Sequence, residues 1–173
     1  METARLRLIP YGPGHYLALI QGLAEYETYT GLRAAPGLRD FIESGEVSPA
    51  WLERLQTATT ADPWEHGFGV VHRDDGLVIG GCGFKGPPDA DGVVEIAYGI
   101  VPAYERRGYA TEAAGALVAI ASADPRVRLI RAHTLATNNA SVRVLTKNGF
   151  SFVGDVVDPE DGPVWRWERG PAR

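Results

Sequence analysis

An alanine-rich segment at residues 108–123 constrains the fold of this chain more than any other stretch. Its larger apolar residues are Leu117, Val118 and Ile120, and most of the others are alanine. Alanine has the highest helix propensity, and its small side chain lets a helix approach a neighbouring layer closely. We therefore expect a helix that begins at about Gly108 and packs tightly on a β-sheet.

The other segments alternate between strand-like and helix-like patterns. Helices are predicted at residues 15–27, 48–57 and 138–148, with Ser48 as the N-cap of the second. Strands are predicted at residues 3–9, 67–72, 77–84, 93–101, 127–135, 150–157 and 164–168. The Asp74-Asp75-Gly76 turn is typical of a hairpin, so the second to fourth strands should form an antiparallel meander.

This order predicts an α/β fold, with a mostly antiparallel twisted sheet of about seven strands flanked by about four helices. A chain of 173 residues, 45% of them hydrophobic, fits one domain spanning 1–173. Cys82 cannot form an internal disulfide because it is the only cysteine, so we expect a small buried residue.

The charge and the N-terminal sequence exclude several classes of protein. The net charge of -5 argues against a nucleic-acid partner. The first residues are charged, and no apolar run approaches the roughly 20 residues that span a bilayer, so we expect a cytoplasmic protein without membrane contact. No metal site is predicted, because the histidines lack metal-ligand spacing; they are His15, His66, His72 and His133.

A phosphate-binding turn is predicted between the strand at 93–101 and the alanine-rich helix. A helix N-terminus leaves backbone N–H groups unpaired and carries partial positive charge, so it favours anions. Gly108 lets the backbone approach a bulky phosphate, and Arg106 and Arg107 add positive charge. The alternative is an ordinary strand-to-helix connection with solvated arginines.

Two segments resemble the signatures of the GCN5-related N-acetyltransferase (GNAT) family, in the branch of the ribosomal-protein alanine acetyltransferases. The first reads VEIAYGIVP at 94–102 and then RRGYATEA at 106–113. The second reads NNASVRVLTKNGF at 138–150, and the opening TARLRL at 3–8 is similar as well. The likeness spans almost the whole chain and is weakest at 28–64.

The resemblance implies that the chain takes acetyl-CoA and an amine as substrates. It implies that the end of the strand at 93–101 pairs with pantetheine, that the following turn holds the pyrophosphate, and that the second signature faces the thioester. The residues implied to bind the cofactor are Ile100, Val101, Arg106, Arg107, Gly108, Tyr109, Ala110, Thr111, Asn138 and Ser141.

Two positions depart from the family's pattern. Glu105 stands where the phosphate loop usually begins with Gln or Arg, and Leu145 stands where many relatives have a tyrosine that acts as general acid. Ser141 or water must then serve if an acid is needed. A protein that binds acyl-CoA without catalysis, as a sensor or partner, is therefore the alternative function.

Glu95 is the candidate general base, acting directly or through water. It lies mid-strand among apolar residues, where an unpaired carboxylate would be costly. An equal alternative is that Glu95 faces solvent or forms an ion pair. Ser141 is the candidate catalytic residue at the sulfur, with helix capping as its alternative. Tyr98 is expected either in the cofactor cleft or in ordinary packing.

The acceptor amine is not identified by the sequence. Protein N-termini, metabolites, polyamines and antibiotics all remain open, and the apolar final strands could pair across a homodimer. One further motif is rejected: residues 81–86 match the dinucleotide pattern G-x-G-x-x-G, but two prolines follow where that pattern needs a helix.

Overall fold

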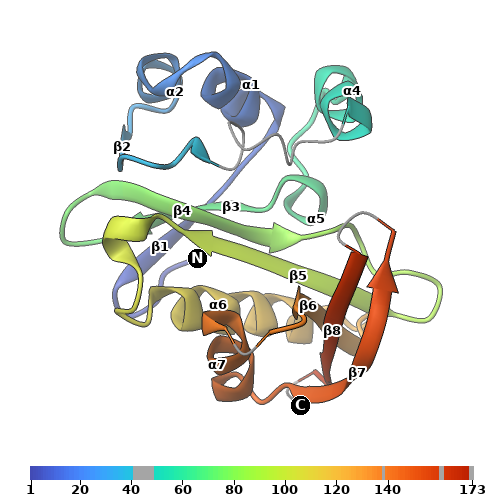
Figure 1. The fold of residues 1–173 in the computed structure, drawn as a ribbon. Helices are drawn as coiled ribbons and strands as arrows, with labels where there is room; N and C mark the ends of the chain where they lie inside the picture. The colour runs from blue at the N-terminus through green and yellow to red at the C-terminus, as the bar shows by residue number, and fades with distance from the viewer. Residues whose placement is uncertain (41–48, 138, 160–161, 172–173) are drawn as a thin grey trace.

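A twisted sheet of eight strands forms the centre of the molecule in the computed structural model, which describes residues 1–40, 49–137, 139–159 and 162–171 (Figure 1). The strand order is β1-β3-β4-β5-β6-β8-β7, and β2 pairs in parallel with β4. The strands are β1 (Leu6–Pro10), β2 (Arg33–Ala34), β3 (Phe68–His72), β4 (Leu77–Phe84), β5 (Val93–Ile100), β6 (Leu129–Leu135), β7 (Ser151–Asp158) and β8 (Gly162–Arg169).

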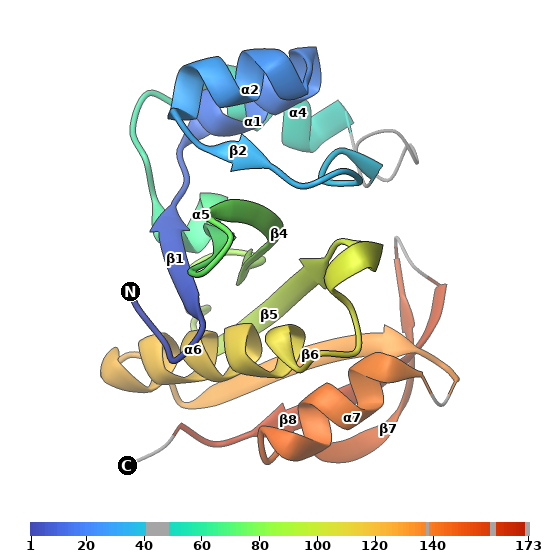
Figure 2. The same ribbon diagram turned by 90° about the vertical axis from the view of Figure 1, so that its left-hand side faces the viewer.

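Helices cover both faces of this sheet (Figures 1 and 2). They are α1 (Pro13–Gln21), α2 (Leu23–Thr30), α4 (Pro49–Thr57), α5 (Pro63–His66), α6 (Tyr109–Ala123) and α7 (Ala140–Lys147), with a 3-10 turn, η1 (Pro102–Tyr104). The first helices lie together on one side, and α6 and α7 lie on the other. Among the described residues, no helix is both long and apolar enough to span a membrane.

The predicted fold class is confirmed, and β3, β4 and β5 form the expected antiparallel meander. The alanine-rich helix is α6, and Ala113, Ala114, Leu117 and Ala121 along it are fully buried. The small residues let α6 lie close beneath β5, as its composition predicted. Cys82 is buried as expected, and burial raises the pKa of its thiol to about 12.

Three local predictions were wrong. The helix expected at 15–27 is divided at Gly22, whose extended backbone ends α1 and begins α2; glycine weakens a helix at that point. No strand was predicted at residues 31–37, which contain β2. The short helix α5 was not predicted, although Asp62 caps it by accepting a hydrogen bond from the Trp64 N–H. Ser48 lies outside the described residues.

Candidate active site

Strands β5 and β6 diverge part-way along their length. They pair in parallel over three residues only, Val93–Glu95 against Leu129–Arg131. Beyond that point β5 stays paired with β4 as far as Ile100, while β6 continues beside β8. Figure 2 shows the two strands separating towards η1. Beyond Glu95, one edge of β5 therefore has no neighbouring strand among the described residues.

The register shows which backbone groups of β5 face this opening. The Lys85 N–H donates to the Glu95 carbonyl, and the Val101 N–H donates to the Ile79 carbonyl. Because backbone direction alternates along an antiparallel strand, the odd-numbered residues of β5 bond to β4. The even-numbered residues point to the other side, where Val94 and Ile96 flank the last residue paired with β6 and the backbone groups of Tyr98 and Ile100 face the opening.

Ile100 and Val101 differ in whether their backbone groups are available to a ligand. Both backbone groups of Val101 are engaged within the chain, because its N–H bonds to Ile79 and its carbonyl accepts from the Tyr104 N–H. Ile100 is the one of the two whose backbone faces the opening. The extended ligand expected beside β5 would therefore pair with Ile100 and not with Val101.

The turn that follows β5 has a backbone conformation typical of an anion-binding site. Arg106 (φ 62°) and Gly108 (φ 86°) are both left-handed, and α6 begins directly after them at Tyr109. Turns that include left-handed residues direct successive N–H groups into one concavity. Gly108 provides no side-chain cap, so no side chain takes the N–H groups of the first turn of α6 there. Arg106, Arg107 and Gly108 are exposed.

Side chains of the β3–β4 hairpin support this turn from outside. The Tyr104 hydroxyl donates to Asp75 at 2.6 Å, and the same carboxylate oxygen lies 2.9 Å from His72 Nδ1. His72 Nε2 lies 2.8 Å from the Tyr109 hydroxyl. The Tyr104 hydroxyl, followed by His72, holds the pKa of Asp75 below its usual value. Two residues that flank the turn are thus tied to one hairpin.

Arg5 and Glu112 hold the turn from a second direction. The guanidinium of Arg5 donates to the Arg107 carbonyl at 2.9 Å and lies over the Tyr109 ring at 4.6 Å. Glu112 accepts from the Thr3 hydroxyl at 2.6 Å and from Arg5 Nε at 2.8 Å. Burial raises the pKa of Glu112, but these hydrogen bonds outweigh it and leave the pKa lowered.

Glu95 lies at the point where β5 and β6 part, and its side chain is 19% exposed. Its Oε1 is 2.8 Å from Lys85 Nζ and 3.1 Å from His133 Nδ1. The Arg166 Nε–H donates to His133 Nε2, which places the proton of a neutral imidazole on Nδ1, facing Glu95. The ion pair that sequence reasoning gave as an alternative is therefore present.

Ser141 lies in the first turn of α7 and is not its cap. Asn139 is the N-cap, and its side chain accepts from the backbone N–H groups of Ser141 and Val142. The Ser141 side chain is within hydrogen-bonding reach of Tyr98, across the opening between β5 and α7. Burial raises the pKa of Tyr98 to about 12, and the interaction with Ser141 opposes that rise. Leu145 is fully buried in the core.

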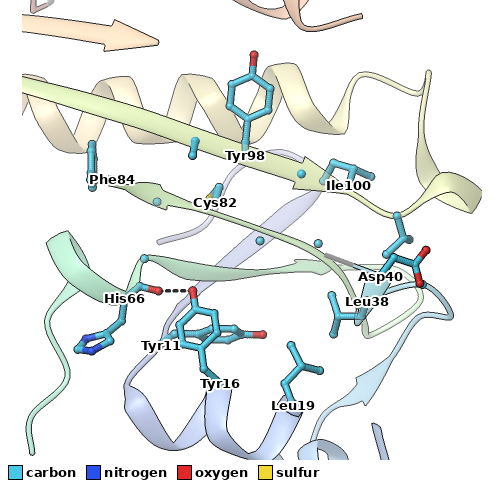
Figure 3. A pocket seen from close by; sticks show the side chains of 18 of the residues that line it. Tyr11, Tyr16, Leu19, Leu38, Asp40, His66, Cys82, Phe84, Tyr98 and Ile100 are labelled. Carbon is cyan, nitrogen blue, oxygen red and sulfur yellow. Dashed lines mark hydrogen bonds between the residues drawn. The ribbon is translucent and has the colours of Figure 1, made fainter. Parts of the chain in front are cut away.

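A pocket of about 660 Å³ lies between β4–β5, α1, α5 and residues 37–40. Figure 3 shows Tyr11, Tyr16 and Leu19 on one side of the strands, whereas Tyr98 points away from them. The Tyr16 hydroxyl donates to the His66 carbonyl at 2.6 Å, which fixes its ring. The lining from the strands includes the facing pairs Gly81–Gly99 and Gly83–Ala97. We call this cavity the β4–β5 pocket.

The structure thus brings most of the predicted site residues around one opening. Tyr109 is buried, and Ala110 and Thr111 are partly buried in the first turn of α6. Asn138 lies outside the described residues. Sequence reasoning missed His133 and Lys85 as neighbours of Glu95. Only the register of β4, β5 and β6 places them there.

Comparison with known proteins gives matches over most of the chain. Residues 5–151 match the family model described as an acetyltransferase (GNAT) domain. The chain is 36% identical over 81 residues to the uncharacterized N-acetyltransferase YjdG of Bacillus subtilis (strain 168), covering 47% of this chain and 48% of the relative. The aligned part of the chain thus spans about half the length of this curated relative.

Solved structures share the fold over nearly the full chain. A GNAT-family acetyltransferase from Bacillus anthracis superposes with a TM-score of 0.67 at 19% identity, covering 99% of this chain and 98% of that one. RimL, a ribosomal L7/L12 alpha-N-protein acetyltransferase in complex with coenzyme A, gives 0.66 at 16% identity, with 97% and 95% covered. At these identities the likeness concerns the fold.

Proposed function

This chain belongs to the GNAT family of acetyltransferases, and from that premise we propose that it is an acetyl-CoA-dependent N-acetyltransferase acting on a primary amine. The observation that carries the proposal is the open edge of β5, which runs directly into the left-handed turn before α6. An extended arm that ends in a pyrophosphate matches this succession of a free strand edge and a concave set of N–H groups.

The residues present fit coenzyme A along this path. The backbone of Tyr98 and Ile100 would hold the pantetheine arm as a neighbouring strand holds its partner. The N–H groups of the turn from Arg106 to Ala110 would hold the pyrophosphate, with the two arginines adding charge. The thioester would then lie deeper in the opening, between Glu95 and Ser141.

We propose direct transfer at that point. The amine nitrogen forms a bond to the thioester carbonyl carbon, the carbon–sulfur bond breaks, and CoA leaves as thiolate or thiol. Glu95 would receive the ammonium proton, directly or through water, while Lys85 and His133 fix its orientation. Ser141 would stabilise the sulfur, since Asn139 performs the capping that would otherwise occupy it.

A non-catalytic acyl-CoA-binding protein is the second candidate, and two observations favour it. Glu95 Oε1 already lies 2.8 Å from Lys85 Nζ, so the carboxylate has a partner within the chain. Leu145 is buried, so the position of the family's usual acid is part of the core. In this case the chain would bind acetyl-CoA with no transfer to any amine.

Calorimetric titration with acetyl-CoA tests the common premise of both candidates. The control is the double variant Arg106→Glu with Gly108→Trp, which reverses charge and fills the turn. We expect micromolar binding by the wild type and none by the control. Release of CoA thiol across an amine panel then separates an enzyme from a sensor, and an absence of wild-type binding would overturn both.

A further inference from the structure

The floor of the β4–β5 pocket carries almost no side chains. Gly81 lies opposite Gly99, and Gly83 lies opposite Ala97, on the adjacent strands β4 and β5. Side chains alternate between the faces of a sheet, so these four residues share one face. Glu95 is two residues before Ala97 and lies on the same face. These four residues form a strip of backbone with almost no side chains, which we call the Gly81–Gly99 strip, and it leads towards the candidate base.

Two of these glycines are not required by the fold. A Cβ on Gly99 would meet no atom within 4 Å, and one on Gly81 would meet only the Phe68 carbonyl oxygen, at 3.7 Å. Neither has a positive φ. Gly83 is different, because its Cβ would come within 2.7 Å of the Gly67 backbone. An unneeded strand glycine often marks a place where a ligand approaches the backbone closely.

The walls of the pocket are apolar and its charges are acidic. Tyr16 and Leu19 of α1 face the strip, with Leu38 beside them (Figure 3). The described lining residues include Asp40 and Glu65 but no lysine or arginine. Figure 3 places Asp40 at the opposite end of the pocket from His66, the neighbour of Glu65. Both carboxylates are exposed, so they lie at the rim and not in the apolar interior.

We infer that the β4–β5 pocket takes a small primary amine with a flat apolar body, which lies on the Gly81–Gly99 strip with its amino group towards Glu95. This inference rests on the proposed function and names the substrate class. The acidic rim would attract the ammonium form, and the aromatic and aliphatic walls would hold the body. A cavity of about 660 Å³ lies in the size range of small-molecule sites.

Other acceptors fit this lining less well. An extended polyamine would place charges between the two rim carboxylates, against tyrosine and leucine side chains that offer no acidic partner. A protein N-terminus would bring a backbone whose polar groups need partners, and the apolar walls provide few of them.

A panel of acceptors tests the inference directly. We would compare phenethylamine and cyclohexylmethylamine with spermidine, kanamycin and an alanine-initiated hexapeptide, by release of CoA thiol. The apolar monoamines should show at least tenfold higher kcat/KM than the other three. A preference for spermidine, kanamycin or the peptide would overturn the inference and leave the proposed function standing.

Gly99→Val provides the matched structural test, since a Cβ at this position has no described atom within 4 Å and the valine side chain would occupy the strip. Gly170→Val is its control, because a Cβ there also meets nothing within 4 Å, at a position away from the pocket. We expect Gly99→Val to raise the KM for phenethylamine at least tenfold, with unchanged acetyl-CoA affinity and melting temperature. The control should match the wild type in all three quantities, and an unchanged KM in Gly99→Val would contradict the inference.

Calorimetric measurement of phenethylamine binding in the absence of acetyl-CoA tests the pocket assignment separately from the proposed function. Binding that Gly99→Val abolishes, in a protein that does not bind acetyl-CoA, would support the pocket assignment and reject the proposed function. Normal binding of acetyl-CoA without binding or acetylation of either apolar amine would reject the pocket assignment alone.

Discussion

The carboxylate of Glu95 and the imidazole of His133 meet where β5 and β6 part, with Oε1 3.1 Å from Nδ1. Glu95 is the last residue of β5 that pairs with β6, and His133 lies two residues beyond the paired part of β6, so the contact spans the inner end of the opening. Lys85, which directly follows β4, approaches the same oxygen. The candidate base thus has two nitrogen-bearing groups from different segments within 3.1 Å.

Glu95→Gln should lower kcat by about 10²-fold or more, in the range typical of a general base. The amide is nearly the same size but cannot accept the proton, so acetyl-CoA affinity should stay unchanged. Steady-state rates and calorimetry measure the two quantities. Wild-type kcat in the variant would remove Glu95 from the mechanism.

His133→Gln should alter the same step less strongly, because this residue orients Glu95 and is not expected to touch the substrate. We expect a several-fold loss of kcat with an unchanged KM for the amine and an altered pH–rate profile, because the carboxylate loses one of the two groups that contact it. A variant with reduced stability and an unchanged profile would indicate packing alone.

Ser141→Ala and Tyr98→Phe should each lower kcat several-fold, and the double variant should be little worse than the poorer single one, because groups that act together are not additive. The pKa of Tyr98 is raised to about 12 by burial, so its hydroxyl stays protonated at any practical pH and should add no titration step to the profile. Additive losses would contradict a joint role.

Gly108→Ala should weaken acetyl-CoA binding by about tenfold, because a left-handed non-glycine residue costs roughly 1–2 kcal/mol and its methyl group would approach Arg5 at 3.3 Å. Gly31→Ala is the control: Gly31 has φ 67°, with no atom within 4 Å of its Cβ position. Similar melting temperatures with a difference in Kd would identify the turn as the binding element.

Glu112→Gln should destabilise the protein by about 1.5 kcal/mol at pH 7, the low end for hydrogen bonds to a charged group. The pKa of Glu112 is lowered in the folded state, so its contribution is present above the unfolded pKa of about 4.3 and is lost as the pH falls through the folded value. Urea unfolding at pH 7 and pH 3 should show the difference shrinking; a constant difference would contradict this linkage.

Pairing of two copies through the edge strand β7 is the hypothesis for a homodimer, and Phe152, Val153 and Val157 on this strand are exposed. Val157 is 80% exposed, so Val157→Asp should leave the fold intact and weaken any self-association through this edge. Sedimentation of the wild type as a monomer at working concentration would end the hypothesis.

Local signals in the sequence were sufficient for much of the fold. The alanine run predicts α6 because propensity and tight packing agree there, and the bounds of β4 follow from its turn signals and apolar run. The turn at Gly108 was equally visible. The break at Gly22 was not, because one glycine in an apolar pattern is compatible with either outcome.

The contacts between distant segments that form the candidate site could not be predicted from the sequence. Glu95 was predicted to need a partner or an exposed position, but neither Lys85 nor His133 could be named before the pairing of β4, β5 and β6 was known. The same holds for Ser141, whose hydroxyl is available only because Asn139 caps α7.

The short pairing of β5 with β6 also has a mechanical consequence. The sheet consists of two parts, β1–β5 and β6–β8. Their only shared ladder among the described residues is the three-residue pairing of β5 with β6 at Val93–Glu95. A pantetheine chain bound along the free edge of β5 would extend the contact between the two parts of the sheet and restrict their relative motion. Amide hydrogens of β5 and β6 beyond Glu95 should therefore exchange more slowly when coenzyme A is bound. The decrease in exchange rate measures how strongly the bound cofactor restricts motion between the two parts of the sheet.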